Sequence, residues 1–220
     1  MKPTQENYVL SYPGVFTVQF GDGEFSSFLT GDVNFTAGQV LAPIEGITKG
    51  PKAYTSVQCG PSSDEDHIEL NSDLVYINHS CEPNVCFDLT SLDPSEWHCR
   101  ALKDIAAGTP LTFFYPSTEW DMAQPFDCLC GTPTCLGKIQ GAAHLTRDDL
   151  STRGFINPHI LAMIAERDSE QTASKKIELL QQTLTSPKFT EGTCSSCGYG
   201  RSARNDLNRC GCRPASPTRA

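Results

Sequence analysis

The sequence predicts a mainly β protein, built of small sheets, with helices toward its C-terminal end. Short extended segments separated by glycine and proline fill residues 8–116, and helical spacing of apolar residues begins only after residue 141. Strands this short and this closely spaced indicate a compact β-fold rather than alternating βαβ units. A chain of 220 residues can bury one good core with a small appendage.

The predicted strands follow one another in a regular series. They span residues 15–20, 40–42, 54–58, 74–77, 85–87 and 111–115. A glycine-rich turn at 21–23 ends the first strand, and the acidic run at 61–66 is expected to be a solvated loop. No internal repeat is present, so the series predicts one domain rather than an array.

Two helices are predicted after the strands. The first spans residues 158–167, and the second spans 170–185 and ends before Pro187. Apolar residues at helical spacing give the second helix one face that we expect to pack on the body. The members of this face are Ala173, Ile177, Leu180 and Leu184. The remaining tail has few large apolar residues, and we expect it to be ordered only if a metal holds it.

The net charge of −9 is divided unevenly along the chain. Residues 188–219 carry six basic and two acidic side chains, which leaves 11 basic and 24 acidic side chains before them. Such an acidic body is a poor nucleic-acid binder and attracts cationic partners such as a basic peptide, although ordinary solubilising charge gives the same pattern. The N-terminus lacks a basic start followed by an apolar stretch, and no membrane-length apolar run is present. We therefore expect an intracellular protein, cytoplasmic or nuclear.

Eleven cysteines are many for such a chain, and an odd number cannot all pair with one another. Without an export signal, clustered cysteines more often bind metal than form disulfides. Cys81 and a C-x-C-x4-C run at Cys128, Cys130 and Cys135 together offer the four soft ligands of a tetrahedral zinc site. A second set, Cys194, Cys197, Cys210 and Cys212, has spacing that suits a small zinc module. Unpaired buried thiols are the alternative for the first set, and no family pattern supports the second.

Residues 76–84, Tyr-Ile-Asn-His-Ser-Cys-Glu-Pro-Asn, are the most informative run in the chain. An apolar segment stops abruptly there at polar and small residues, which is typical of a segment fixed in a hydrogen-bond network or a ligand pocket. Residues 78–84 match the NHSC-x-PN motif of the SET-domain protein methyltransferases. Residues 32–41 resemble an early turn of that family, and residues 102–115 resemble the stretch that leads to its catalytic tyrosine. The C-x-C-x4-C run resembles the family's cysteine-rich post-SET segment.

This resemblance covers roughly residues 25–141 and implies both an architecture and domain boundaries. It implies a SET-domain fold, in which small sheets surround a knot-like core formed where residues 78–81 pass through a loop made by residues 111–115. The implied divisions are a SET-like domain at 8–116, a post-SET zinc segment at 117–141, a helical extension at 142–187 and a basic, cysteine-containing tail at 188–220.

The resemblance also implies a site for S-adenosylmethionine. Its contacts would come from Asn78, His79, Phe28, Leu136 and Tyr115. Tyr115 is the expected catalytic residue, since methyl transfer mainly needs the amine, the methyl carbon and the sulfur to be aligned, and a fixed phenol oxygen can orient the amine. His79 is not expected to act as a general base.

An aromatic channel would favour the neutral lysine amine by lowering the pKa of the lysine. Phe113, Tyr76 and Phe114 are the expected channel residues, with core packing as the open alternative for the last two. At the first of these positions the family carries Phe or Tyr, and Phe favours di- or trimethylation.

Two functions follow from this resemblance and from its departures. The family's G-x-G is replaced by Ser26-Ser27-Phe28, Thr109-Pro110 replaces two glutamates, and Phe114 replaces an acidic or amide residue. The first function is an S-adenosylmethionine-dependent methyltransferase that acts on the lysine of a basic protein or peptide. The alternative is a repurposed SET-like protein that binds or converts a small molecule, for example in secondary metabolism, or a non-catalytic peptide-binding module.

Overall fold

The structure, a computed structural model, describes residues 6, 8–23 and 25–185 of the chain. The chain divides into two units, residues 1–171 and 172–220, and the second is described only as far as residue 185, where helix α2 ends. Pro187, the basic tail and the second cysteine set lie outside the described residues. In the described part, no helix is both long and apolar enough to cross a membrane.

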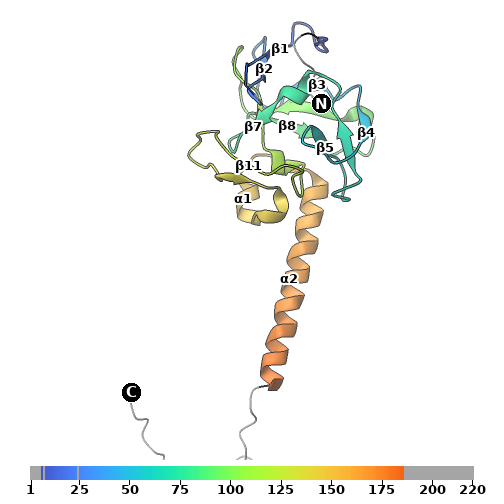
Figure 1. Cartoon of the computed structure of the whole chain (residues 1–220), viewed down its shortest axis with the longest axis vertical. Helices are drawn as coiled ribbons and strands as arrows, with labels where there is room; N and C mark the ends of the chain where they lie inside the picture. Colours follow the sequence, from blue (N-terminus) through green and yellow to red (C-terminus); the bar gives the residue numbers. More distant parts are fainter. Residues whose placement is uncertain (1–5, 7, 24, 186–220) are drawn as a thin grey trace, which may run out of the picture. The chain divides into compact units, whose positions relative to one another are not determined.

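The prediction of small β-sheets with few helices is confirmed (Figure 1). The strands are β1 (Phe16–Gln19), β2 (Phe28–Gly31), β3 (Val40–Pro43), β4 (Thr48–Gly50), β5 (Ser56–Gln58), β6 (His67–Glu69), β7 (Asn78–His79), β8 (Val85–Asp88), β9 (His98–Ala101), β10 (Thr112–Phe113), β11 (Phe126–Asp127) and β12 (Lys138–Ile139). The helices are the 3-10 turns η2 (Asp73–Tyr76), η3 (Pro94–Glu96), η4 (Tyr115–Ser117) and η5 (Ala142–His144), with α1 (Arg147–Ser151) and α2 (Pro158–Thr185).

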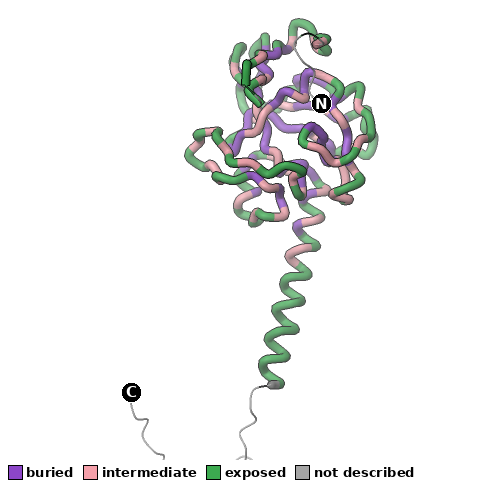
Figure 2. Tube along the Cα trace, in the orientation of Figure 1, coloured by how far each residue is buried: buried purple, intermediate pink, exposed green. Residues whose placement is uncertain are grey.

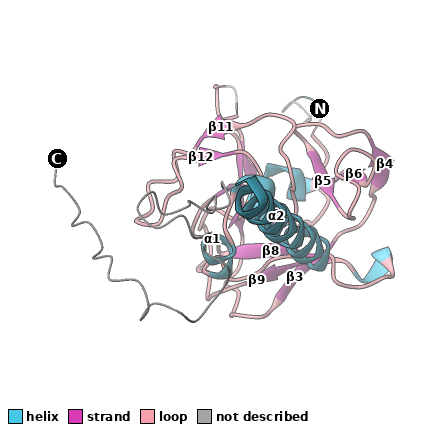
Figure 3. Ribbon diagram, turned by 90° about the horizontal axis from the view of Figure 1, so that it is seen from below, coloured by secondary structure: helices cyan, strands magenta, loops and turns pink. Residues whose placement is uncertain are grey.

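The strands form sheets of two or three members. Two sheets have three strands, in the orders β3-β9-β8 and β4-β6-β5, and β1-β2 and β11-β12 form antiparallel pairs. Figure 3 shows β3, β9 and β8 side by side. The two remaining strands, β7 and β10, pair in parallel, with Asn78 opposite Thr112 and His79 opposite Phe113. This parallel pair brings the motif segments 78–84 and 102–115 together.

Two apolar clusters hold the first unit together. The main core contains residues from all the strands between β1 and β10 except β4 and β7, and Phe113 belongs to it. The smaller cluster joins Phe114 to Ala142, Leu150, Ile160 and Ile164. Successive side chains of an extended chain point to opposite sides, so the two neighbouring phenylalanines enter different clusters. Figure 2 shows the buried residues gathered in the region of the sheets.

Asn157, just before α2, links the C-terminal extension to the main sheet. Its side-chain Nδ2 donates to the carbonyls of Phe87 (2.9 Å) and Ser117 (3.1 Å), and its Oδ1 accepts from the Leu89 amide (2.9 Å). The side chain is fully buried, and these three bonds satisfy both its oxygen and its nitrogen. The residues that follow Tyr115 are thereby fixed against β8.

The predicted strand at residues 74–77 is wrong, because residues 73–76 form the 3-10 turn η2. The Asp73 carboxylate accepts hydrogen bonds from the Ser11 and Tyr12 amides and from the Tyr8 hydroxyl, which ties the start of the turn to the N-terminal segment. Leu74 and Tyr76 are both buried. A short apolar run buried on several sides gives the same sequence pattern as a buried strand.

The two predicted C-terminal helices are one helix, α2, because neither glycine nor proline interrupts residues 159–185. The first turns bury Ile160 and Ile164. Further along the helix, in the second unit, Ile177, Leu180 and Leu184 are 56%, 55% and 82% accessible, and the packing of this face on the body stays a prediction.

Candidate active site

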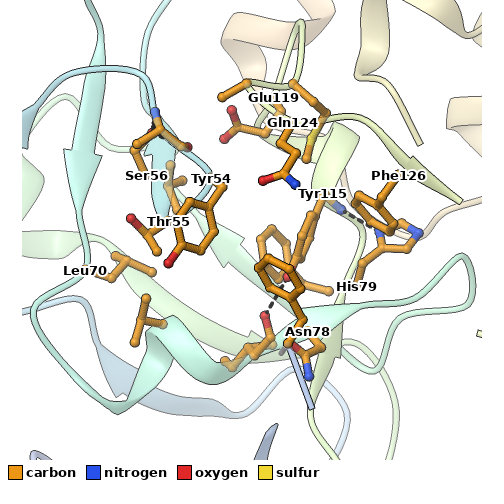
Figure 4. Close-up of a pocket in the computed structure, with 18 of the residues that line it drawn as sticks. Tyr54, Thr55, Ser56, Leu70, Asn78, His79, Tyr115, Glu119, Gln124 and Phe126 are labelled. Atoms are coloured by element: carbon orange, nitrogen blue, oxygen red, sulfur yellow. Dashed lines mark hydrogen bonds between the residues drawn. The ribbon is translucent and has the colours of Figure 1, made fainter. Parts of the chain in front are cut away.

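A pocket of about 570 Å³ lies beside the parallel pair β7-β10. It is lined by main-core residues on one side and by the segment 122–130 on the other. Figure 4 shows Asn78, His79 and Phe126 at one end, which we call the motif end. Thr55, Ser56 and Glu119 lie at the other, which we call the polar end, and Tyr115 stands between the two.

Tyr115 begins η4, directly after β10, and its ring is fixed by aromatic neighbours. The ring centroids of Phe113, His79 and Phe126 lie 4.6, 5.2 and 6.0 Å from its own. The hydroxyl donates to the Ile77 carbonyl at 3.4 Å. Burial, with a smaller contribution from the negative charge of Glu119, raises the pKa of Tyr115. The phenol therefore keeps its proton at neutral pH and serves as a hydrogen-bonding group rather than as a base.

His79 is a neutral imidazole, and each of its two ring nitrogens has a partner in the protein. Its Nδ1 accepts from the Tyr115 amide at 3.2 Å, so the proton resides on Nε2, which lies 3.4 Å from the Cys81 sulfur. Burial, and secondarily the charge of Arg153, lowers the pKa of His79 to about 3. Since both ring nitrogens are engaged by the protein, the side chain has no free nitrogen with which to act on a substrate.

The structure brings only some of the other predicted site residues to the pocket. Asn78 and Phe113 line it, and the Asn78 amide donates to the Ser27 carbonyl at 2.9 Å, which ties the segment before β2 to the motif. The predicted contacts Phe28 and Leu136 are not among the lining residues, and neither are the predicted channel residues Tyr76 and Phe114. The last two are buried core side chains, which is the alternative left open for them.

The four cysteines of the first predicted metal site converge in space. Their sulfurs all lie within 4.8 Å of one another, and those of Cys81 and Cys128 are 3.9 Å apart. A tetrahedral zinc ion with bonds of about 2.3 Å places its sulfur ligands about 3.8 Å apart. The amides of Leu136 and Gly137 donate to the sulfurs of Cys81 and Cys135 at 3.4 Å each, as expected around thiolates. Burial raises the pKa of Cys81 and Cys128, so four thiolates need a cation, and the donor set fits zinc.

Arg153 holds this cluster from the side of the helical extension, and no sequence motif indicated it. Its buried guanidinium donates to the carbonyls of Cys81 (2.8 Å) and Thr134 (3.0 Å), and it lies 5.4 Å from the centre of the Phe114 ring. The contacts join positions 19 to 72 residues apart in the chain. Only the folded structure reveals such a link.

Glu119 at the polar end was also missed. Its Oε1 accepts from the Gln58 amide at 2.7 Å and from the Thr118 hydroxyl at 3.3 Å. Burial raises the pKa of this carboxyl to about 7, against the lowering effects of the two hydrogen bonds and of the Lys52 charge. A lone glutamate four residues after Tyr115 carries no signal in the sequence, because its burial depends on a strand 61 residues away.

Comparison with known proteins places this architecture in a family. A SET-domain family model matches residues 21–116. A methyltransferase of Aspergillus flavus, flvH, is 42% identical over 156 residues, which cover 70% of this chain and 84% of flvH. The chain therefore belongs to the family of SET-domain methyltransferases, and the prediction of this family is confirmed.

Other relatives match over shorter stretches. The H3 lysine-9 specific histone-lysine N-methyltransferase dim-5 of Neurospora crassa is 31% identical over 104 residues, which cover 40% of this chain and 31% of dim-5. The H3 lysine-4 specific histone-lysine N-methyltransferase of Aspergillus fumigatus is 39% identical over 64 residues, or 28% of this chain and 5% of that protein. One solved structure, from a study of the product specificity of histone lysine methyltransferases, has a TM-score of 0.40 and 22% identity and covers 56% of this chain and 54% of its own.

Proposed function

We propose that this protein transfers a methyl group from S-adenosylmethionine to the side-chain amine of a protein lysine. One observation carries the proposal: the phenol of Tyr115 is fixed in an aromatic pocket between a motif end and a polar end. The family of the chain supports methyl transfer. Its relatives dim-5 and the Aspergillus fumigatus enzyme, which are named as histone-lysine methyltransferases, support lysine as the acceptor.

The residues of the pocket fit the two requirements of this reaction. S-adenosylmethionine, when bound, supplies a methyl group on a positively charged sulfur. Asn78, His79 and Phe126 would hold it at the motif end, in a pocket whose volume is typical of small-molecule sites. The Tyr115 oxygen orients the acceptor nitrogen, and the apolar faces of Phe87 and Phe113 exclude water and favour an uncharged amine.

Residues beside the pocket bear on two further points, the bound metal and the number of methyl groups transferred. Cys81, Cys128, Cys130 and Cys135 would hold a structural zinc ion, which keeps the segment 126–139 against the pocket. Phe113 has no hydroxyl with which to hold a water beside Tyr115. The space therefore stays open for an amine that already carries methyl groups, and we propose di- or trimethyllysine as the product.

The test is methyl transfer to a library of lysine peptides by the wild type and by Tyr115→Phe at equal zinc content. We expect turnover to fall by ~10²-fold or more, because a positioned polar group at the reacting centre is lost while the ring remains. Calorimetric titration with S-adenosylmethionine should show a much smaller change. Tyr12→Phe is the matched control, since its hydroxyl bonds the Pro43 carbonyl outside the pocket. A folded, zinc-loaded wild type that methylates no peptide would contradict lysine as the acceptor.

A low-mass amine is the second candidate acceptor. The observation that favours it is the pocket itself, whose volume suits a whole small molecule and whose polar end carries Thr55, Ser56 and Glu119. Methylation of free amines without methylation of any peptide would select this candidate.

A further inference from the structure

We propose that Glu119 binds the ammonium group of the acceptor inside the pocket and removes its proton before methyl transfer. This inference deepens the proposed function, because it assigns the polar end of the same pocket. It applies equally to a lysine side chain and to a low-mass amine, since both enter as ammonium ions at neutral pH.

The Glu119 side chain is held in one position. It is only 7% exposed, and its Oε1 is fixed by the Gln58 amide and the Thr118 hydroxyl. Its backbone is fixed as well, because its amide donates to the Tyr115 carbonyl at 3.0 Å and its carbonyl accepts from the Ala142 amide at 2.9 Å. A carboxylate fixed in this way can act on a ligand without first being ordered.

The second carboxylate oxygen, Oε2, has no hydrogen-bond partner among the described residues. Figure 4 shows the carboxylate facing the space between Ser56 and Tyr115. This oxygen is accessible from the pocket, and a charge-assisted bond from a carboxylate to an ammonium is among the stronger hydrogen bonds. An ammonium ion is therefore the ligand that best completes this site.

No cation of the described protein already neutralises the carboxylate. The charged and titratable groups that influence it or respond to it are Lys52, Tyr115 and Cys59. The Lys52 ammonium pairs instead with Asp64 at 3.3 Å and Asp121 at 3.6 Å. The phenol and the thiol are neutral at pH 7, because burial raises the pKa of both.

The proton transfer balances within the pocket. One N–H bond of the acceptor ammonium breaks, its proton moves to Oε2 of Glu119, and the electron pair stays on nitrogen. The resulting neutral amine can then be oriented by Tyr115. A buried carboxyl whose pKa is near 7 suits this role, because general bases are most effective when their pKa lies near the working pH.

The experiment measures binding of n-butylammonium, a mimic of the lysine side chain, to zinc-loaded protein without cofactor, by calorimetry or NMR between about pH 5.5 and pH 8.5. The probe stays cationic across this range. We expect wild-type affinity to rise with pH through about pH 7 as Glu119 ionises. Glu119→Gln keeps an amide oxygen for Gln58 and should weaken binding by about tenfold or more at pH 8. Binding of n-butanol, the uncharged probe, should change little.

Asp121→Asn is the matched control, because it removes a half-exposed carboxylate two residues away that does not line the pocket. It should retain the wild-type affinity and pH profile. Undetectable binding to wild type, a flat wild-type profile, or equal affinity of Glu119→Gln at pH 8 would overturn the proposal. The pH dependence of n-butylammonium binding to the wild type tests the proposal even if the variant does not fold. Cofactor titration and peptide methylation test the proposed function separately. A failure of methyl transfer is therefore distinguishable from a failure of the ammonium site at Glu119.

Discussion

The two walls of the pocket are held by different forces. The wall formed by β5, η2 and β10 belongs to the main apolar core, which supplies Val57, Leu74 and Phe113. The opposite wall comes from residues 122–130, which belong to a longer segment, residues 121–138, in which no residue is buried. What converges in that segment is sulfur, not hydrocarbon, because the cluster at Cys81 collects three cysteines from it.

This contrast gives the cysteine cluster a structural role. A segment whose apolar side chains, such as Phe126 and Leu136, are only partly buried gains little free energy with which to offset the conformational entropy lost when it folds. Metal binding supplies that free energy at a single point, on the order of 10 kcal/mol for structural zinc sites. One wall of the pocket is therefore a property of the apolar core, and the other is a property of the metal.

Metal removal should have the largest effect and should separate the two walls. We expect chelation to increase backbone hydrogen exchange throughout residues 121–138 while β3, β8 and β9 stay protected, because only the first region lacks buried apolar residues. Hydrogen-exchange mass spectrometry with and without zinc measures this. Elemental analysis should show at least one zinc per chain beforehand. Unchanged exchange in residues 121–138 would contradict the dependence on metal.

Apolar truncation should act on one wall alone. Leu111→Ala removes a fully buried core side chain and should lower the free energy of unfolding by about 2 to 5 kcal/mol without changing the zinc content. The matched change Leu129→Ala lies between two of the cysteines, where the side chain is 94% exposed, and should cost less than about 0.5 kcal/mol. Urea denaturation followed by fluorescence compares them. Equal effects would show that the cysteine-rich wall also depends on apolar packing.

The features that could be predicted from the sequence are those that local patterns encode. Residues 78–81 and 112–115 were identified by their motif, and the convergence of the four cysteines followed from ligand chemistry and spacing. Glu119 and Arg153 could not be found in this way. Each is defined by partners far away in the chain, such as Gln58 and Cys81, and burial rather than residue type gives each its chemistry.

Phe113 and Phe114 also differ in a way that only the folded structure defines, because their side chains belong to different apolar clusters. Their neighbouring positions predict nothing about which one faces the pocket, and only the two cores decide it. Helix α2 is a related case. Helical spacing predicted helical structure at residues 158–167 and 170–185 but not that the two segments form one helix, because spacing alone does not state where a helix ends.

The smallest expected effect concerns the polar end and its dependence on pH. The pKa of Glu119 is raised from 4.5 to about 7, so the folded state holds a proton that the unfolded state releases. Stability from this group is complete below about pH 4.5 and is lost as the pH rises toward 7. Glu119→Gln has no carboxyl at this position, so its stability does not fall with rising pH for this reason. Between about pH 5.5 and pH 8, the variant should therefore gain about 2 kcal/mol in its free energy of unfolding relative to wild type.

Urea denaturation of both proteins at the two pH values, at constant zinc, measures this difference. Asp121→Asn again serves as the control, because its carboxylate is half exposed and does not line the pocket. Saturating n-butylammonium should stabilise the wild type at pH 8 and not at pH 5.5, since only the ionised carboxylate pairs with it. If the variant and the wild type differ by the same amount at both pH values, Glu119 is not the protonated, buried group that its surroundings require, and the polar end is an ordinary wall of the pocket.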